Sequence, residues 1–245
     1  MKKILTAGAL VKEVIYTRAA GREGPRIRAA KRKASTEAQQ LMNAKYSWQK
    51  LELMLAANFV PGDLVITLTY DDTHLPATRE AAVARLKRFR SDLAAVRREH
   101  GEELRMIWAT ENASGLGRWH HHVVINTTGQ DFSEIAKLWD CGDDLEIRKL
   151  EVGRAKNYES LARYMAKEAR ERPGLRSWSY TRNCRKPEVE TFVVPDDTEL
   201  APPEDAIVME DQTKRTDYGS YHYIKYLAAA PQQLRRQRPK PKRRR

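Results

Sequence analysis

Three consecutive histidines, His120, His121 and His122, are the residues of this chain best suited to chemistry. The β-branched residues that follow them predict a strand over residues 119–126. Because side chains alternate along a strand, His120 and His122 should point to one face and His121 to the other. Two imidazoles on one face form half of a metal site.

A carboxylate can extend this donor set. Glu111 follows a strand predicted over residues 104–110, and residues 112–117 form a turn of about hairpin length. A hairpin would bring Glu111 back beside His120 and His122. Such a mixed nitrogen and oxygen set leaves coordination positions open, as a catalytic site requires. Mg²⁺ or Mn²⁺ suits this role, although imidazole ligands would also accept zinc, cobalt or nickel.

A helix predicted over residues 157–170 can supply a nucleophile and a cation. Tyr164 and Lys167 are three residues apart and therefore share a helix face. A tyrosine with an ordinary pKa of about 10 needs such a cation to attack at neutral pH. Tyr158 lies about 240° from Tyr164 around the helix, which favours a single nucleophile. Beside a metal, these groups suit phosphoryl transfer.

Further elements must position these residues. A central strand is predicted at residues 64–70, a helix from near Thr78 to before Gly101, a short helix at 132–139 and a strand at 144–150. The order from residue 63 is therefore β-α-β-β-α-β-α, preceded by a helix from about residue 36 to 57. Its first six elements match the ferredoxin-like (split βαβ) plan, an α+β fold whose antiparallel sheet has helices on one face. The other face would then be open for binding.

The formal net charge of +12 suits a polyanionic partner, most simply nucleic acid. Residues Arg235–Arg245 carry eight basic side chains, which lowers the +12 to +4 for the rest of the chain. A second basic cluster lies between Arg18 and Lys33. The tail is either a solubilising segment or a nonspecific DNA tether that acts by counterion release, and we favour the tether.

These residues occur in the order of the three motifs of the HUH endonuclease superfamily. The motifs are Thr67-Leu68-Thr69-Tyr70, Glu111 with His120–His122, and Tyr164-Met165-Ala166-Lys167-Glu168. In particular, the chain resembles the rolling-circle replication initiators of the replication-associated class from small phages and plasmids. The basic segment Ser179–Pro187 resembles the one that follows the tyrosine helix in that class. The resemblance covers roughly residues 35–190.

The resemblance implies a nicking and joining mechanism. His120 and His122 would hold the divalent metal, Mg²⁺ or Mn²⁺, with Glu111 as the third ligand. Tyr164 would attack single-stranded DNA at a replication origin, which gives a 5′-phosphotyrosine and a free 3′-hydroxyl. Lys167 would stabilise the phenolate or the phosphate.

The resemblance also implies DNA contacts from Arg182, Asn183 and Lys186, and from Thr67 and Thr69 on the first strand. The chain departs from the family pattern at His121, where a hydrophobic residue usually separates the two metal ligands. This leaves open a register that uses His121, although strand alternation favours His120 with His122.

We expect four segments: a basic N-terminal segment at 1–34, the HUH nicking domain at 35–187, an acidic segment at 188–230 and a basic disordered tail at 231–245. The acidic segment is either a linker or forms extra strands that pack on the core. No apolar run has the length of a membrane span, and the two cysteines form no disulfide framework. We therefore expect a cytoplasmic protein with no membrane contact.

Two other functions fit the same sequence. One is a relaxase or a single-tyrosine transposase on the same scaffold. The other is a non-catalytic, ferredoxin-like nucleic-acid binding module with structural histidines. The chain has no GxxxxGK[ST] phosphate loop, so an initiator of this kind would need a separate helicase, in addition to a polymerase.

Overall fold

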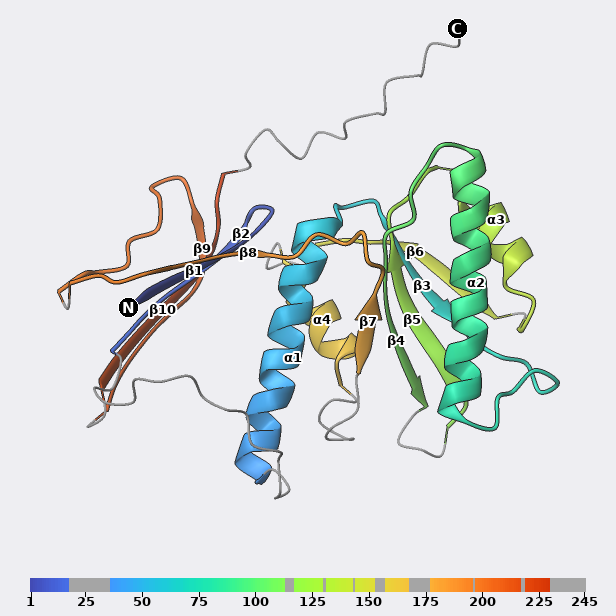
Figure 1. Ribbon diagram of the computed structural model, residues 1–245, viewed down its shortest axis with the longest axis horizontal. Coiled ribbons are helices and arrows are strands. Elements are labelled where there is room, and N and C mark those ends of the chain that lie inside the picture. Colours follow the sequence, from blue (N-terminus) through green and yellow to red (C-terminus); the bar gives the residue numbers. More distant parts are fainter. Residues whose placement is uncertain are drawn as a thin grey trace, which may run out of the picture. The chain divides into compact units, whose positions relative to one another are not determined.

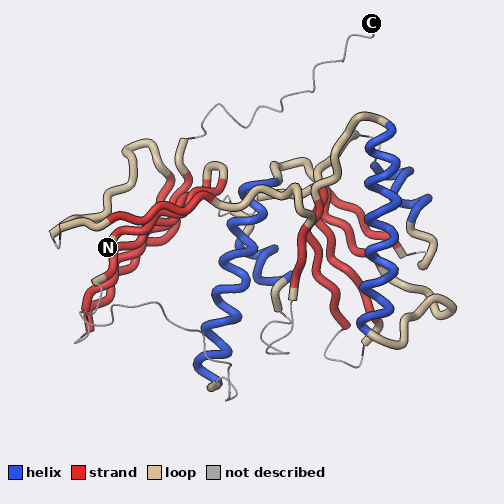
Figure 2. Tube along the Cα trace, viewed as in Figure 1, coloured by secondary structure: helices blue, strands red, loops and turns tan. Residues whose placement is uncertain are grey.

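The computed structural model of this chain contains two antiparallel five-stranded sheets and four helices within the residues it describes (Figures 1 and 2). The predicted α+β class is confirmed. The chain divides into two compact units, Pro25–Lys186 and Met1–Gly24 with Pro187–Arg245. The described residues are 1–17, 36–112, 117–129, 131–142, 144–152, 157–167, 177–195, 197–216 and 219–229.

Both predicted basic segments, at 18–33 and 235–245, lie outside the described residues, as do residues 113–116 of the predicted hairpin turn. Among the helices that are described, none combines the length and the apolar composition needed to cross a membrane.

The central unit is built on a sheet with the strand order β6-β3-β5-β4-β7. Its elements follow the predicted order β-α-β-β-α-β, preceded by α1 and followed by α4 and β7. Their bounds are α1 Glu37–Asn58, β3 Leu64–Leu68, α2 Arg79–Glu99, β4 Met106–Asn112, β5 Trp119–Ile125, α3 Asp131–Leu138, β6 Leu145–Lys149, α4 Glu159–Met165 and β7 Trp178–Tyr180.

The two long helices begin where hydroxyl side chains cap them. The Thr36 hydroxyl accepts a hydrogen bond from the Gln39 N–H at 3.3 Å, and the Thr78 hydroxyl accepts one from the Ala81 N–H at 3.2 Å. Each cap satisfies a backbone donor that the first helical turn leaves unpaired. Both caps were predicted from the sequence.

Helices cover both faces of the central sheet, so the prediction of helices on one face only is wrong (Figure 1). The two crossover helices α2 and α3 do share one face, where they pack on Ile66, Trp108 and Val123. The opposite face is covered by α1 and α4, which pack on Val65, Ile107 and Val124. The physical reason is that the central strands carry apolar side chains on both sides, as strands buried on both faces do.

A buried ion pair joins the end of α2 to the start of α3. The Arg97 guanidinium donates to Asp131 Oδ1 at 2.5 Å and to Asn126 Oδ1 at 3.1 Å. Asp131 also accepts from the N–H groups of Thr128 and Gly129. Arg97 is 1% exposed and Asp131 3%, so each charge depends on the other for compensation.

The second unit is a sheet with the order β8-β1-β2-β10-β9, formed by both ends of the chain. Its core includes Val11, Leu200, Ile224 and Tyr226. The strands expected within residues 188–230 are present, and they pair with the N-terminal strands in a separate sheet. Their bounds are β1 Lys2–Ala7, β2 Leu10–Tyr16, β8 Glu188–Phe192, β9 Ile207–Thr216 and β10 Gly219–Leu227.

Candidate metal centre and nucleophile

The register of the β4–β5 hairpin brings the three predicted donor residues together. Glu111 lies directly opposite His120, and the neighbouring pair places His122 on the same side of the sheet. Glu111 Oε1 lies 2.7 Å from Nε2 of His120 and 2.7 Å from Nε2 of His122. The three ligand atoms lie within 4.8 Å of one another, so this group is suited to hold a metal ion.

The carboxylate of Glu111 is buried and strongly held in its charged form. Burial alone would raise the pKa of Glu111, but hydrogen bonds from His120, His122 and Lys167 outweigh it and hold this pKa well below its usual range. Lys167 Nζ lies 2.7 Å from the same oxygen, Oε1. The site therefore already concentrates positive charge on one buried anion, as a cation site requires.

The donor chemistry fits a divalent metal. Both histidines direct Nε2 towards Glu111, and Nε2 is a common metal-binding atom. The second carboxylate oxygen of Glu111, Oε2, is buried and has no hydrogen-bond partner among the described residues. A bound cation would compensate this oxygen, which otherwise carries a desolvation cost.

Hydrogen bonds to the outer nitrogens orient both imidazoles. His120 Nδ1 lies 3.1 Å from the carbonyl oxygen of Arg118, to which it donates. His122 Nδ1 lies 3.5 Å from the hydroxyl of Thr67, which in turn donates to Glu146 at 3.4 Å. Such outer partners fix the tautomer and the ring plane of metal-binding histidines. The hydrogen bond with Glu111 raises the pKa of His120, despite its burial.

His121 lies on the opposite face, where both ring nitrogens are engaged. Nε2 is 2.7 Å from the Tyr70 hydroxyl and Nδ1 is 2.8 Å from the Thr110 hydroxyl. Tyr70 donates its single hydroxyl hydrogen to the Ala82 carbonyl, so His121 Nε2–H donates to Tyr70 and Nδ1 accepts from Thr110. Burial lowers the pKa of His121 to about 3, so the ring is neutral.

The predicted nucleophile lies next to the donor group. The Tyr164 ring is 4.6 Å from the His122 ring, centroid to centroid, and 43% of the tyrosine is exposed. Lys167 Nζ lies 4.4 Å from the centre of the Tyr164 ring. In contrast, Tyr158 is buried and donates to the Phe59 carbonyl, and burial raises its pKa to about 12. Only Tyr164 of these two is accessible to a substrate.

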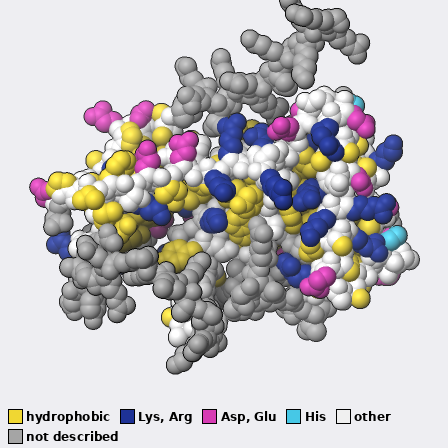
Figure 3. All heavy atoms as spheres, viewed as in Figure 1, with side chains coloured by type: hydrophobic (Ala, Val, Ile, Leu, Met, Phe, Trp, Pro, Cys, Tyr) yellow, Lys and Arg dark blue, Asp and Glu magenta, His cyan; other side chains and the backbone are white. Residues whose placement is uncertain are grey.

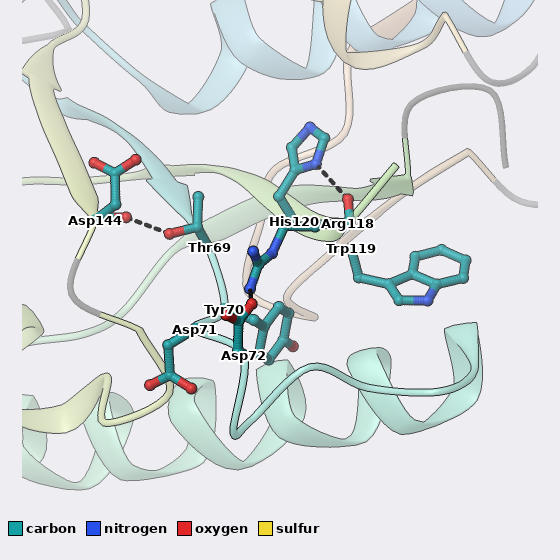
Figure 4. A pocket seen from close by; sticks show the side chains of 8 residues that line it. All are labelled: Thr69, Tyr70, Asp71, Asp72, Arg118, Trp119, His120 and Asp144. Atoms are coloured by element: carbon teal, nitrogen blue, oxygen red, sulfur yellow. Dashed lines mark hydrogen bonds and ion pairs between the residues drawn. The ribbon is translucent and has the colours of Figure 1, made fainter. Parts of the chain in front are cut away.

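A cleft opens beside His120, at one end of strands β3 and β5 (Figure 4). Thr69 lies in its wall and donates to the carbonyl oxygen of Asp144, so its hydroxyl hydrogen is engaged by the protein. An ion pair between Arg118 and Asp72 crosses the same region. The cleft gives His120 access to solvent. Its lining residues are Thr69, Tyr70, Asp71, Asp72, Arg118, Trp119, His120 and Asp144.

The three predicted DNA contacts after β7 are placed apart from the donor group. Asn183 donates to the Leu104 carbonyl at 3.1 Å, which ties the turn to the body of the unit. Arg182 lines a groove between α2 and the strands β4 and β7. Lys186 is exposed near the end of the central unit. All three are exposed, but the structure brings none of them into the group formed by Glu111 and the histidines.

Sequence reasoning missed the groups that support the donors. Glu146 of β6 holds the Thr67 hydroxyl, and the Arg118 carbonyl holds His120. Strand alternation could have indicated Glu146, because Thr67 and Glu146 are register partners in the β3–β6 pairing. A backbone carbonyl leaves no signal in the residue type.

The fold and the site define an α+β protein with a candidate His–His–Glu metal centre and an adjacent exposed tyrosine. Residues 63–171 match the family model of the replication-associated protein ORF2, a family of rolling-circle replication initiators of phages, and this region of the chain belongs to that family. The match takes in β3 through α4, and therefore every donor residue with Tyr164 and Lys167. The resemblance stated from the sequence is confirmed. No curated protein and no solved structure matches the chain.

Proposed function

We propose that the protein is a metal-dependent endonuclease and joining enzyme that nicks single-stranded DNA and thereby initiates rolling-circle replication. One observation carries the proposal. An exposed tyrosine, Tyr164, stands 4.6 Å from the ring of His122, within the same cluster as Glu111, His120 and Lys167. A nucleophile, a cation and a metal donor set are thus assembled at one solvent-accessible place.

The chemistry is a phosphodiester exchange. The Tyr164 oxygen, after loss of its proton, attacks the scissile phosphorus and forms a new phosphorus–oxygen bond. The bond to the 3′-oxygen breaks, and that oxygen takes up a proton to give a free 3′-hydroxyl. The 5′-phosphate remains on the tyrosine, and attack by a 3′-hydroxyl in the reverse direction rejoins the strand. Because bonds are exchanged rather than hydrolysed, no external energy source is needed.

His120, His122 and Glu111 are the residues that would hold the metal, for which we propose Mg²⁺ or Mn²⁺. When bound, such an ion polarises a phosphate oxygen and takes up negative charge in the transition state. The protein's own part is to orient the ligands. The Arg118 carbonyl holds His120, and the Thr67 hydroxyl holds His122.

Lys167 supplies a fixed positive charge beside the nucleophile. Its Nζ lies 4.4 Å from the centre of the Tyr164 ring and 2.7 Å from Glu111 Oε1. A cation at this position stabilises both a phenolate and a phosphate oxygen. We therefore assign Lys167 to charge stabilisation in the exchange step.

The ferredoxin-like connectivity and the family match support the replicative role over the other functions that share this chemistry. The nicked strand would offer its 3′-hydroxyl to a polymerase, and a separate helicase would open the duplex. Thr67 and Thr69 lie on the strand beside the histidines, where a DNA strand would pass on its way to Tyr164.

The test is covalent capture of DNA. The full-length protein is incubated with Mn²⁺ and labelled single strands that tile the replication origin of its replicon, and adducts are separated on a denaturing gel. The wild type should form a labelled adduct, and Tyr164→Phe should form none. Tyr158→Phe is the matched control on the same helix and should retain the adduct. An adduct on Tyr164→Phe, or none on the wild type with any strand, overturns the proposal.

A further inference from the structure

A second functional surface lies between α2 and the neighbouring strands β4 and β7, where a groove has a volume of about 350 Å³. Four of its lining residues are cations, Arg79, Lys87, Arg90 and Arg182, and none of the described residues that line it is acidic. Lys and Arg side chains gather on this face of the central unit (Figure 3). A groove lined by one sign of charge concentrates ligands of the opposite sign.

The cations form a row rather than a cluster. Arg79, Lys87 and Arg90 lie on one side of α2, at intervals of eight and three residues. At 1.5 Å per residue, the row from Arg79 to Arg90 extends for about 16 Å along the helix. A compact anion cannot contact charges over this length. A chain with a charge at every repeat can, and this favours a polyanion over a small phosphorylated ligand.

At least two of these charges are not neutralised by the protein. Among the described residues, no carboxylate pairs with Lys87 or Arg182, and both side chains are exposed. In contrast, Arg88 on the outer side of the same helix pairs with Asp92. Uncompensated cations beside a groove are available to replace the counterions of a bound polyanion.

The groove is suited to the backbone of a strand rather than to its bases. Its aromatic floor, Trp108, is only 8% exposed, and the Arg90 guanidinium lies over the ring at 5.6 Å from its centre. A base therefore has no free aromatic face on which to stack. Ser179, the register partner of Trp108, adds a hydroxyl to the opposite wall. Hydroxyl and guanidinium groups are common partners of phosphate oxygens.

We infer that this groove binds the phosphodiester backbone of DNA at a second place, separate from the candidate metal centre. Trp108 lies on the sheet face covered by α2, whereas His122 and Glu111 lie on the other face. Among the described strands of the central unit, β7 is the edge next to the groove. The inference rests on the proposed function, which supplies DNA as the ligand. The groove would hold a strand that continues past the nick.

The test measures the salt dependence of binding to labelled oligo-dT by the full-length protein. Every variant carries Tyr164→Phe, so no covalent adduct contributes. Lys87→Ala with Arg182→Ala should weaken binding. It should also make the plot of log affinity against log salt concentration shallower by about 1.4, because two phosphate contacts at about 0.7 each are lost. Arg88→Ala with Lys137→Ala removes the same two residue types outside the groove and should leave the slope near the parent value.

Lys87→Arg with Arg182→Lys keeps both charges and should keep the slope, which separates charge from folding defects. Equal slopes for the groove variant and the control variant would overturn the inference. The adduct assay decides the proposed function independently. A wild type without adduct removes the nicking proposal, and a groove variant with a weaker salt dependence still supports this surface.

Discussion

At the scale of single residues, the three adjacent histidines have different roles. His120 and His122 point towards Glu111, whereas His121 lies in the core between Tyr70 and Thr110. Removing His121 leaves two buried hydroxyl groups without a partner and creates a cavity. Removing His120, which is partly exposed, takes away a metal donor with little loss of packing.

We therefore expect His121→Ala to lower the free energy of unfolding by about 2–4 kcal/mol, while the folded protein still binds Mn²⁺. His120→Ala should lose Mn²⁺ binding with a much smaller loss of stability. Chemical denaturation and calorimetric titration of the two variants measure these quantities. Loss of Mn²⁺ binding in folded His121→Ala would show that the middle histidine is a ligand.

Lys167 and a metal ion would compete for the same carboxylate oxygen. Because Lys167 Nζ lies 2.7 Å from Glu111 Oε1, a metal must displace or share this contact. Lys167→Met should therefore tighten Mn²⁺ binding by roughly ten-fold, equal to about 1.4 kcal/mol, while it slows adduct formation. Arg163→Met is the charge-matched control, since Arg163 pairs with Glu159 instead. If both variants change Mn²⁺ affinity equally, the effect is only long-range charge.

Much of the donor geometry could be predicted from residue order. Strand alternation separates His121 from its neighbours, and the hairpin returns Glu111 to them. Helical spacing places Lys167 beside Tyr164. The contact between Lys167 and Glu111 could not be predicted, because it depends on how α4 packs against the sheet. Periodicity alone also assigns Arg97 to the polar side of α2, and only the tertiary pairing with Asp131 explains its burial.

At the scale of elements, the predicted helices and most strands are present within a few residues of their expected bounds. Their apolar runs and caps are strong local signals. The three-residue strand β7 was not predicted, because so short a segment has no readable period. The role of α1 and α4 as cover for the second sheet face was also missed. That role depends on how the two helices dock on the sheet.

The junction of α2 and α3 should make stability depend on pH. Burial would raise the pKa of Asp131, but hydrogen bonds from Thr127, Thr128 and Gly129, with the charge of Arg97, lower it below its ordinary value of 3.8. As the pH falls, the unfolded chain therefore binds this proton before the folded chain does. The stabilisation is complete above pH 3.8 and is lost as the pH falls through the folded pKa.

Asp131→Asn should remove this dependence and lower the free energy of unfolding at neutral pH by about 3–5 kcal/mol, because Arg97 stays buried without its counter-charge. Asp92→Asn, at an exposed pair on α2, should cost less than about 0.5 kcal/mol. Denaturant unfolding between neutral and acidic pH measures both variants. Equal costs would show that the buried pair is compensated in another way.

At the scale of the whole molecule, both ends of the chain build one sheet. β1 and β2 are flanked by β8 on one side and β10 on the other. A sequence reading cannot pair residues 2–16 with residues 188–227, since nothing in local composition specifies a contact over that separation. For the same reason the acidic segment was open to interpretation as a linker.

The two units should differ in their tolerance of truncation. A chain that ends at Lys186 keeps β1 and β2 without their outer partners, and an isolated two-stranded hairpin is at best marginally stable in water. This truncation should expose apolar strand faces and self-associate in size-exclusion chromatography. Removal of residues 1–24 as well should restore a monodisperse protein that binds Mn²⁺. Monodisperse behaviour of the first truncation would contradict this expectation.

The shared sheet also sets an order of events during synthesis. Residues 25–186 leave the ribosome as a complete unit while the last three strands of the other sheet have not yet been translated. Domains generally fold as units, with the earlier parts of a chain folding first. The nascent hairpin of β1 and β2 must therefore wait, with its edges unpaired, until translation is almost finished. The candidate nicking centre would be assembled before the polypeptide that carries it is complete.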